Sequence, residues 1–239
     1  MEKIVKKFYD SIAEKYHKIT ADHFYNAYLE VPATMSLIKQ IKNKQVLDLG
    51  CGTGRHTKVL QRRRANVYGI DLSRKMIKIA KNEVKSVKLV IGSAYNLPYK
   101  SGCFDLVVAG LVADYFEDLD KAFREIYRVL KKSGIFIFSI KNPLIAVSES
   151  IKGMPKTYRK FGNYFKEGKM YVKWPSFNLK TPYYHRTFQS WIRAIIRNDF
   201  ILEDFLDAKP IKAGRKINPE AFDTYSKIPH FSVFKVRKL

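Results

Sequence analysis

Short apolar runs alternate with amphipathic segments over residues 45–141. Each run is brief, bounded by charged or turn residues, and rich in branched or aromatic side chains, as strands are. The expected strands are residues 45–50, 66–71, 87–92, 103–110 and 135–141. The segments between them have helical periodicity, including one capped by Ser73 and one over 119–133 that Gly134 is expected to end. This alternation is typical of βαβ units and predicts an α/β fold with a doubly wound, Rossmann-like, mostly parallel sheet.

The two ends of the chain extend the pattern. Residues 2–18 form a predicted helix with an apolar face, and a second helix is expected around 22–40, interrupted near Pro32. Helical periodicity returns late in the chain, in FQSWIRAIIRND. Two further strands, FILEDFLDA and HFSVFKVRK, are expected after it.

The regular alternation stops after Pro143. Residues 151–186 hold nine aromatic residues and nine lysines or arginines against one acid, Glu167. The aromatic residues are Tyr158, Phe161, Tyr164, Phe165, Tyr171, Trp174, Phe177, Tyr183 and Tyr184. A long irregular segment inside a compact domain is usually functional, so we expect a loop-rich lid or binding insertion after the fifth strand.

Composition narrows the class of protein. The chain has 239 residues, of which 46% are hydrophobic, as expected for a folded domain. Cys51 and Cys103 are too few for a disulfide framework and are expected to be free thiols. No segment reads as a signal peptide or a membrane span, so a cytoplasmic protein without membrane contact is expected. The formal net charge of +23 leaves a nucleic-acid partner open, although scattered surface lysines explain it equally simply.

The stretch VLDLGCGTG, residues 46–54, carries the clearest chemistry. A strand containing Asp48 runs through G-x-G-x-G into a helix, which places free backbone N–H groups at the carboxyl edge of the sheet. A dinucleotide fingerprint needs glycine where this chain has the bulky Arg55. Asp71 ends the next strand, where a carboxylate can accept hydrogen bonds from ribose hydroxyls. The motif therefore favours an adenosine cofactor without a pyrophosphate.

Together with GID at 69–71 and the block FDLVVAGLVADYFEDLDKAFREIYRVLKKSGIFIFSI, the motif resembles the class I S-adenosylmethionine-dependent methyltransferases, within them the methyltransferase type 11 group. The resemblance covers nearly the whole chain and implies S-adenosyl-L-methionine as cofactor and a seven-stranded sheet whose last strand is antiparallel. It also implies a single domain over 1–239. Its parts would be a helical cap (1–42), a cofactor-binding half (43–142), a lid or substrate insertion (143–186) and a C-terminal helix with strands (187–239).

The resemblance implies a cofactor site along the strand ends. The glycines would let the backbone approach the methionine part, Asp48 would lie near its ammonium or support the loop, and Asp71 would bind the ribose. The implied residues are Asp48, Gly50, Cys51, Gly52, Gly54, Asp71, Leu72, Met76, Ser93, Ala94, Ala109 and Tyr16. Met76 and Tyr16 could equally be core residues. The family often has an acid after the third strand that accepts from the adenine amino group, whereas this chain has Ser93.

Two residues are candidates for general-base catalysis. Asp114 follows the fourth strand, where the family commonly shows histidine. It could draw a proton, hold a cationic acceptor, or simply be a helix-initiating or solvated acid. His185 matches a His-Arg-Thr run of the family and could be a base or a structural residue. Its neighbour Arg186 could bind an anionic acceptor. His17 and His56 are interpreted as incidental, and no spacing suggests a metal.

Three functions fit these residues. The first is a methyltransferase that modifies an oxygen, nitrogen or sulfur atom of a small-molecule acceptor under an aromatic lid. The second is an RNA methyltransferase, with tRNA as one such substrate, whose basic and aromatic insertion follows phosphates and stacks bases. The third is a non-catalytic protein that binds the cofactor. The sequence favours the first, and it does not define the acceptor or the oligomeric state.

Overall fold

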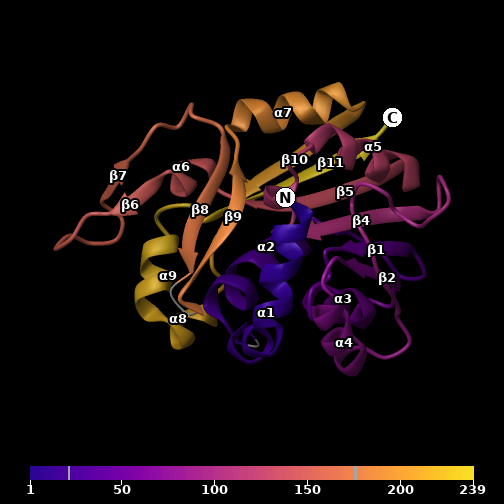
Figure 1. Cartoon of the computed structure of the whole chain (residues 1–239), viewed down its shortest axis with the longest axis horizontal. Coiled ribbons are helices and arrows are strands. Elements are labelled where there is room, and N and C mark those ends of the chain that lie inside the picture. The colour runs from indigo at the N-terminus through magenta and orange to yellow at the C-terminus, as the bar shows by residue number, and fades with distance from the viewer. Residues whose placement is uncertain (21, 175–176) are drawn as a thin grey trace.

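A seven-stranded sheet forms the centre of the computed structural model, which describes residues 1–20, 22–174 and 177–239 (Figure 1). Its strand order is β10-β11-β5-β4-β1-β2-β3. The strands are β1 (Gln45–Leu49), β2 (Asn66–Asp71), β3 (Lys88–Ile91), β4 (Phe104–Gly110), β5 (Leu130–Lys141), β10 (Phe200–Asp207) and β11 (Phe231–Lys238). Strand β11 pairs antiparallel with both β5 and β10, and the other pairings are parallel. The predicted fold class is confirmed.

Helices cover both faces of the sheet, as its two-sided hydrophobicity requires. One face packs against α5 (Leu119–Val129) and α7 (Phe188–Arg197), with Phe123 and Trp191 fully buried there. The other face packs against the π-helix η1 (Phe24–Glu30), α2 (Val31–Ser36), α3 (Arg55–Arg62) and α9 (Pro219–Tyr225). The remaining helices are α4 (Arg74–Glu83), α6 (Pro143–Ala146), α8 (Gly214–Ile217) and the short turn η2 (Ala113–Tyr115).

The N-terminal helix α1 (Glu2–Thr20) lies across the carboxyl edge of the sheet rather than on one of its faces (Figure 1). Ala13 on α1 packs against Met76 and Ile79 of α4. The cap therefore leans on the helix that follows β2, and it lies over the strand ends where open α/β folds bind ligands.

The helix expected over 119–133 is four residues too long. Helix α5 ends at Val129, and β5 begins at Leu130, which pairs with Phe104 of β4. The register then shifts so that Ile135 faces Leu106. Gly134 therefore lies inside an irregular strand and does not end the helix. Pairing with β4 overrides the helical pattern of Lys131 and Lys132, which sequence periodicity alone could not show.

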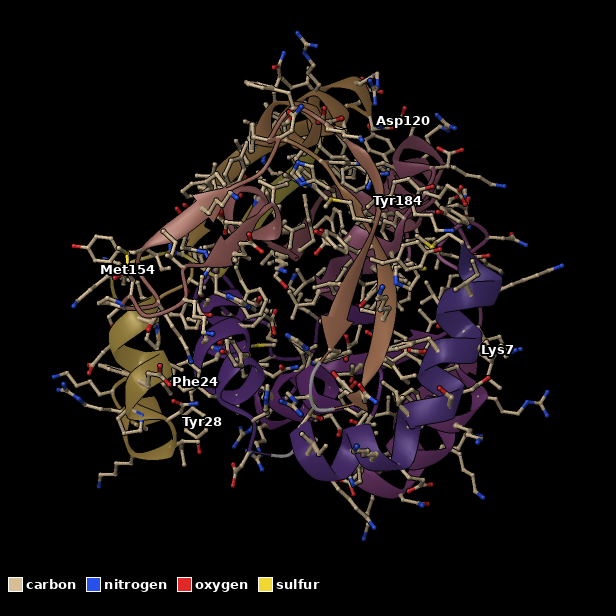
Figure 2. All side chains as sticks on the ribbon, turned by 60° about the vertical axis from the view of Figure 1, so that its left-hand side comes forward. Lys7, Phe24, Tyr28, Asp120, Met154 and Tyr184 are labelled. Carbon is tan, nitrogen blue, oxygen red and sulfur yellow. The ribbon has the colours of Figure 1, made fainter. Side chains whose placement is uncertain are left out.

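The insertion after β5 is more regular than expected. It contains two antiparallel hairpins, β6 (Ser148–Ser150) with β7 (Arg159–Phe161), and β8 (Gly168–Trp174) with β9 (Leu179–His185). The β6–β7 hairpin projects away from the sheet, whereas β8–β9 runs back toward α1 (Figure 1, Figure 2). Helices α8 and α9, between β10 and β11, were also not expected from the sequence.

Candidate functional site

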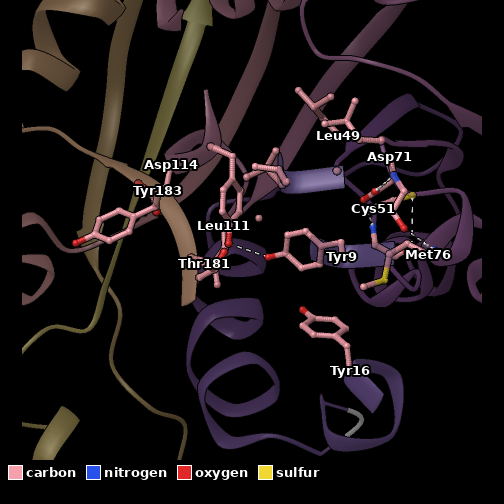
Figure 3. A pocket seen from close by; sticks show the side chains of 18 of the residues that line it. Tyr9, Tyr16, Leu49, Cys51, Asp71, Met76, Leu111, Asp114, Thr181 and Tyr183 are labelled. Carbon is pink, nitrogen blue, oxygen red and sulfur yellow. Dashed lines mark hydrogen bonds between the residues drawn. The ribbon is translucent and has the colours of Figure 1, made fainter. Parts of the chain in front are cut away.

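A cavity of about 580 Å³ lies at the carboxyl ends of β1, β2, β4 and β5. The loops after the strands supply its floor, and α1 and the β8–β9 hairpin supply its cover. Figure 3 shows Asp71, Cys51 and Met76 at one end, Asp114 and Tyr183 at the other, and Tyr9 between them. Its volume falls within the roughly 300–1,000 Å³ of small-molecule sites. We call the end with Asp71, Cys51 and Met76 the strand-end compartment, and the end with Asp114 and Tyr183 the compartment under the insertion.

The glycine loop forms the floor of the first compartment. The backbone N–H groups of Gly50 and Cys51 donate to the carbonyl of Ile70, at 2.7 and 3.0 Å, which ties the loop to β2. Gly50 and Gly52 have φ angles of +70° and +53°, a region that glycine adopts without strain. A Cβ at Gly50 would collide with Val112, whereas one at Gly52 would meet nothing within 4 Å. Gly52 therefore leaves backbone open to the cavity, as a closely approaching ligand requires.

Two acids flank this loop in different roles. Asp71 lines the cavity, and its carboxylate accepts from the N–H groups of Gly52 and Ser73 at 2.9 and 2.8 Å. Burial raises the pKa of Asp71 to about 6, and the two backbone hydrogen bonds oppose that rise. Asp48 is buried outside the cavity lining and accepts from the Thr57 hydroxyl at 2.5 Å. Of the two roles predicted for Asp48, this position favours support of the glycine loop over contact with the cofactor's ammonium group.

Apolar residues wall the same compartment. Leu72, Met76 and Ala94 line it, and Tyr16 covers it from α1. Ser93 and Ala109, also predicted for the cofactor, are not among the lining residues, and Gly54 likewise lies behind the loop. The Ser93 hydroxyl instead donates to the carboxylate of Glu2, which does line the cavity. An acid from α1 thus stands where the family often supplies one after β3, and the sequence reasoning missed it because Glu2 is so distant in the chain.

The second compartment brings together polar groups from three elements. Asp114 follows β4, Lys141 ends β5, and Thr181 and Tyr183 come from β9. The Asp114 carboxylate accepts from the backbone N–H of Lys141 at 2.8 Å. Burial raises the pKa of Asp114 to about 7, against the lowering effects of that hydrogen bond and of nearby cations. A carboxyl group with this pKa can accept a proton near neutral pH.

Two tyrosines stand between the compartments. The hydroxyls of Tyr9 and Tyr115 are 2.8 Å apart, which joins α1 to the turn after β4 (Figure 3). Burial raises the pKa of both, that of Tyr115 to about 12, so both remain protonated phenols at neutral pH. They can orient a ligand by hydrogen bonding but cannot supply a base.

His185 does not reach the cavity. It is 1% exposed, its Nε2 lies 2.8 Å from the carbonyl oxygen of Tyr164, and it is absent from the lining residues that the structure describes. The predicted role as a general base therefore has no geometric support. Arg186 also lies outside the lining, where it donates to the carbonyls of Phe116 and Glu117. Its charge nevertheless acts on Asp114.

Of the two incidental roles predicted for His56, a surface residue or a packing residue, the structure contradicts the first. His56 lines the cavity, and its Nε2 lies 3.1 Å from Glu30, whose carboxylate is 1% exposed. Burial alone would lower the pKa of His56, but the Glu30 carboxylate raises it above its usual value. Glu30 was not predicted, although an acid in the apolar stretch LEVPATM is a signal of a buried charge. His17, by contrast, lies near the surface beside Glu83, at 3.4 Å.

Two further features concern metal binding and membrane insertion. Within residues 1–20, 22–174 and 177–239, no group of three or more His, Cys, Asp or Glu side chains is arranged to hold a metal ion. Across that same part of the chain, none of the helices combines the length and apolarity needed to cross a membrane. Cys51 and Cys103 are free thiols, as predicted.

Comparison with known proteins points in one direction. A family model described as a methyltransferase domain matches residues 47–138. An uncharacterized protein of Methanocaldococcus jannaschii is 36% identical over 69% of this chain, and a demethylmenaquinone methyltransferase of Thermotoga maritima is 31% identical over 56%. This chain spans 62% and 59% of their lengths. The crystal structure of an S-adenosylmethionine-dependent methyltransferase from Mesorhizobium loti is 25% identical. It superposes with a TM-score of 0.75 over 87% of this chain and 96% of that one.

Proposed function

Because the chain belongs to the class I S-adenosylmethionine-dependent methyltransferases, we propose that it methylates an oxygen, nitrogen or sulfur atom of a small-molecule acceptor held in this cavity. The cofactor is assigned to the strand-end compartment, and the acceptor to the compartment under the insertion.

The first compartment fits the cofactor. Gly52 leaves backbone exposed where a Cβ would project into open space, and Asp71 offers a carboxylate for ribose hydroxyls. Leu72 and Met76 provide an apolar wall for the adenine, and Glu2 provides an acceptor for its amino group. When bound, the cofactor supplies a sulfonium methyl group, which is already an activated electrophile.

The protein's contribution is alignment and exclusion of water. Orientation of reactants can supply roughly 7–11 kcal/mol of a barrier. The phenols of Tyr9 and Tyr115 lie between the two compartments, where they can fix the acceptor. Asp114 can take the proton from a hydroxyl or ammonium acceptor, because its pKa of about 7 suits a general base at neutral pH. A thiolate or carboxylate acceptor would not need this step.

The observation that carries the proposal is how the insertion is docked. Trp174 on β8 stacks with Phe8 of α1 at a ring-centroid distance of 6.1 Å and packs against Tyr16 at 5.9 Å. Phe177 is buried in the same cluster. The hairpin therefore packs onto the cap over the cavity and does not form an open groove along it. Such a closed site suits a small acceptor better than a polymer.

One feature favours RNA as a second candidate. Tyr158, Phe161 and Phe165 of the insertion are exposed, Phe165 by 80% of its surface. Lysines flank them in the sequence, so this arm could stack bases and contact phosphates while a base entered the cavity. We rank this candidate second, because Trp174, an insertion aromatic that lines the cavity, is packed on α1.

A methyl-transfer assay separates the two candidates. The protein is incubated with tritiated S-adenosylmethionine and either a small-molecule filtrate of a cell extract or bulk tRNA. We expect label in the filtrate, with a rate that changes little with salt. Label in tRNA, with activity falling steeply between about 50 and 200 mM salt, would refute the small-molecule proposal.

A further inference from the structure

The compartment under the insertion contains a buried cation that forms no direct ion pair within the described part of the chain. Lys141 ends β5 and lines the cavity, and its ammonium lies 5.6 Å from the centre of the Tyr183 ring. It makes no ion pair with any carboxylate among the residues that the structure describes. Burial lowers the pKa of Lys141, as expected for an ammonium group that has lost water without gaining a full counter-charge.

The surrounding charges do not balance it. Asp114 is the acid acting on Lys141, but it also faces the guanidinium of Arg186. Arg159 adds a further positive charge near Lys141. His230 precedes Phe231, which pairs with Lys141 in the β5–β11 ladder. Burial lowers the pKa of His230 well below the usual value, so its imidazole is neutral. One carboxylate therefore faces several cations at this end of the cavity.

Two polar atoms beside Lys141 also lack partners. Both residues line the cavity, and neither Thr181 Oγ1 nor His230 Nδ1 makes a hydrogen bond of good geometry within the described ranges, although the Thr181 hydroxyl lies close enough to Tyr115 to lower its pKa. Buried polar atoms without partners are rare in native proteins and call for a ligand or water. The Thr181 hydroxyl and a neutral imidazole N–H can both donate, as the Lys141 ammonium does. The lining also includes the aromatic side chains of Tyr183 and Phe231 and the aliphatic side chain of Val172.

We propose that the acceptor is an apolar carboxylic acid whose carboxylate binds the Lys141 ammonium, with Thr181 and His230 as additional donors. The inference rests on the proposed function, since it specifies the small molecule of that site. A carboxylate offers the negative charge that Lys141 lacks, and Tyr183 and Phe231 in the lining suit an apolar body. Lys141 is then a specificity-determining residue, and it also distinguishes this acceptor from an uncharged or cationic one.

Fractionation of the small-molecule filtrate tests the charge of the methyl acceptor. The small-molecule filtrate is separated by ion exchange at neutral pH into anionic, neutral and cationic fractions before incubation with tritiated S-adenosylmethionine. We expect the anionic fraction to accept the methyl group, and phenylacetate to inhibit it more strongly than phenylacetamide or phenyl phosphate. Methylation confined to the neutral or cationic fraction would overturn the inference alone. Methylation of tRNA instead of any fraction would overturn the proposed function with it.

Variants of Lys141 test its role in binding the acceptor. Lys141→Met should raise the KM for the anionic fraction about 10- to 100-fold, the range for loss of a charge-assisted hydrogen bond, and leave the affinity for S-adenosylhomocysteine unchanged. Lys141→Arg should recover part of the loss. Lys235→Met is the matched control, because Lys235 is also a strand lysine with little exposure but pairs with Glu203 outside the cavity. An unchanged KM in Lys141→Met, or an equal rise in Lys235→Met, would refute the assignment.

Discussion

Gly50 offers a direct test of how the loop geometry serves the cofactor site. In Gly50→Ala, the new Cβ would lie 2.9 Å from Val112 Cγ1 and closer still to Cγ2, on a backbone with φ of +70°. The left-handed conformation costs an L-residue about 1–2 kcal/mol, and overpacking typically costs about 1–3 kcal/mol more. We therefore expect the free energy of unfolding to fall by about 2–5 kcal/mol.

Gly52→Ala is the natural comparison. Its φ of +53° brings similar backbone strain, but its Cβ would meet nothing within 4 Å. Stability should fall by only about 1–2 kcal/mol, whereas cofactor affinity should fall sharply because the methyl group projects into the space a ligand occupies. The two alanine variants thus separate damage to the fold from damage to the site.

Urea unfolding and calorimetric titration with S-adenosylhomocysteine measure the two quantities. Adding Val112→Ala to Gly50→Ala removes the clashing methyl groups, so the double variant should recover at least about 1 kcal/mol beyond additivity. The reasoning would be refuted if Gly50→Ala were no less stable than Gly52→Ala, or if Val112→Ala gave no recovery in the Gly50→Ala background.

Three further predictions concern the cavity. The proposed role of Asp71 is to accept hydrogen bonds from ribose hydroxyls in its ionised form. Because its pKa is about 6, the affinity for S-adenosylhomocysteine should fall as the pH drops through about 6, and in titrations Asp71→Asn should bind weakly and independently of pH in that range. With a hydroxyl or amine acceptor, Asp114→Asn should lower kcat about 10²- to 10⁴-fold and remove the acidic limb near pH 7 from the pH–rate profile; an unchanged limb would exclude Asp114 as the base. Trp174→Ala should speed amide exchange in β8 and β9 but not in β1 and β4, because it removes the stacking on Phe8. Equal protection of β8 and β9 in the wild type and the variant would contradict a docked lid.

The central sheet was predictable because its signals are local. For example, the apolar runs that form β2 and β4 have the length of strands and end at Asp71 and at Gly110. The end of α5 was not predictable, because the backbone at Leu130 is fixed by pairing with Phe104 rather than by its neighbours in sequence. The hairpins of the insertion gave weaker signals. Strands β6 and β7 have three residues each, β8 lacks the regular alternation that marks a half-buried strand, and β9 contains Pro182, which disfavours a strand.

The cofactor compartment was likewise easier to predict than the acceptor compartment. Gly50, Cys51 and Gly52 belong to a motif with defined spacing after β1, and Asp71 and Leu72 lie at the end of the neighbouring strand β2. The acceptor compartment combines residues from distant segments that are individually ordinary. Lys141 still carried a usable signal, because it ends a predicted parallel strand and strand ends meet at the ligand-binding edge. Thr181 and His230 carried none before the hairpin and β11 were placed.

The buried acid Glu30 explains how the cap and the catalytic edge act together. Its carboxylate accepts from Thr34 and from Ser139 of β5, at 2.8 and 2.6 Å, and lies beside His56 at the start of α3. Burial alone would raise the pKa of Glu30, but His56 and these hydroxyls hold it below its usual value, and Glu30 in turn raises the pKa of His56, so each partner favours the charged form of the other. A Cβ at Gly110 would overlap the His56 ring, so that glycine admits the imidazole against β4. Buried ion pairs contribute little net stability, which makes positioning the better reason for this one. It fixes the end of η1, the strand edge and the cofactor loop relative to one another.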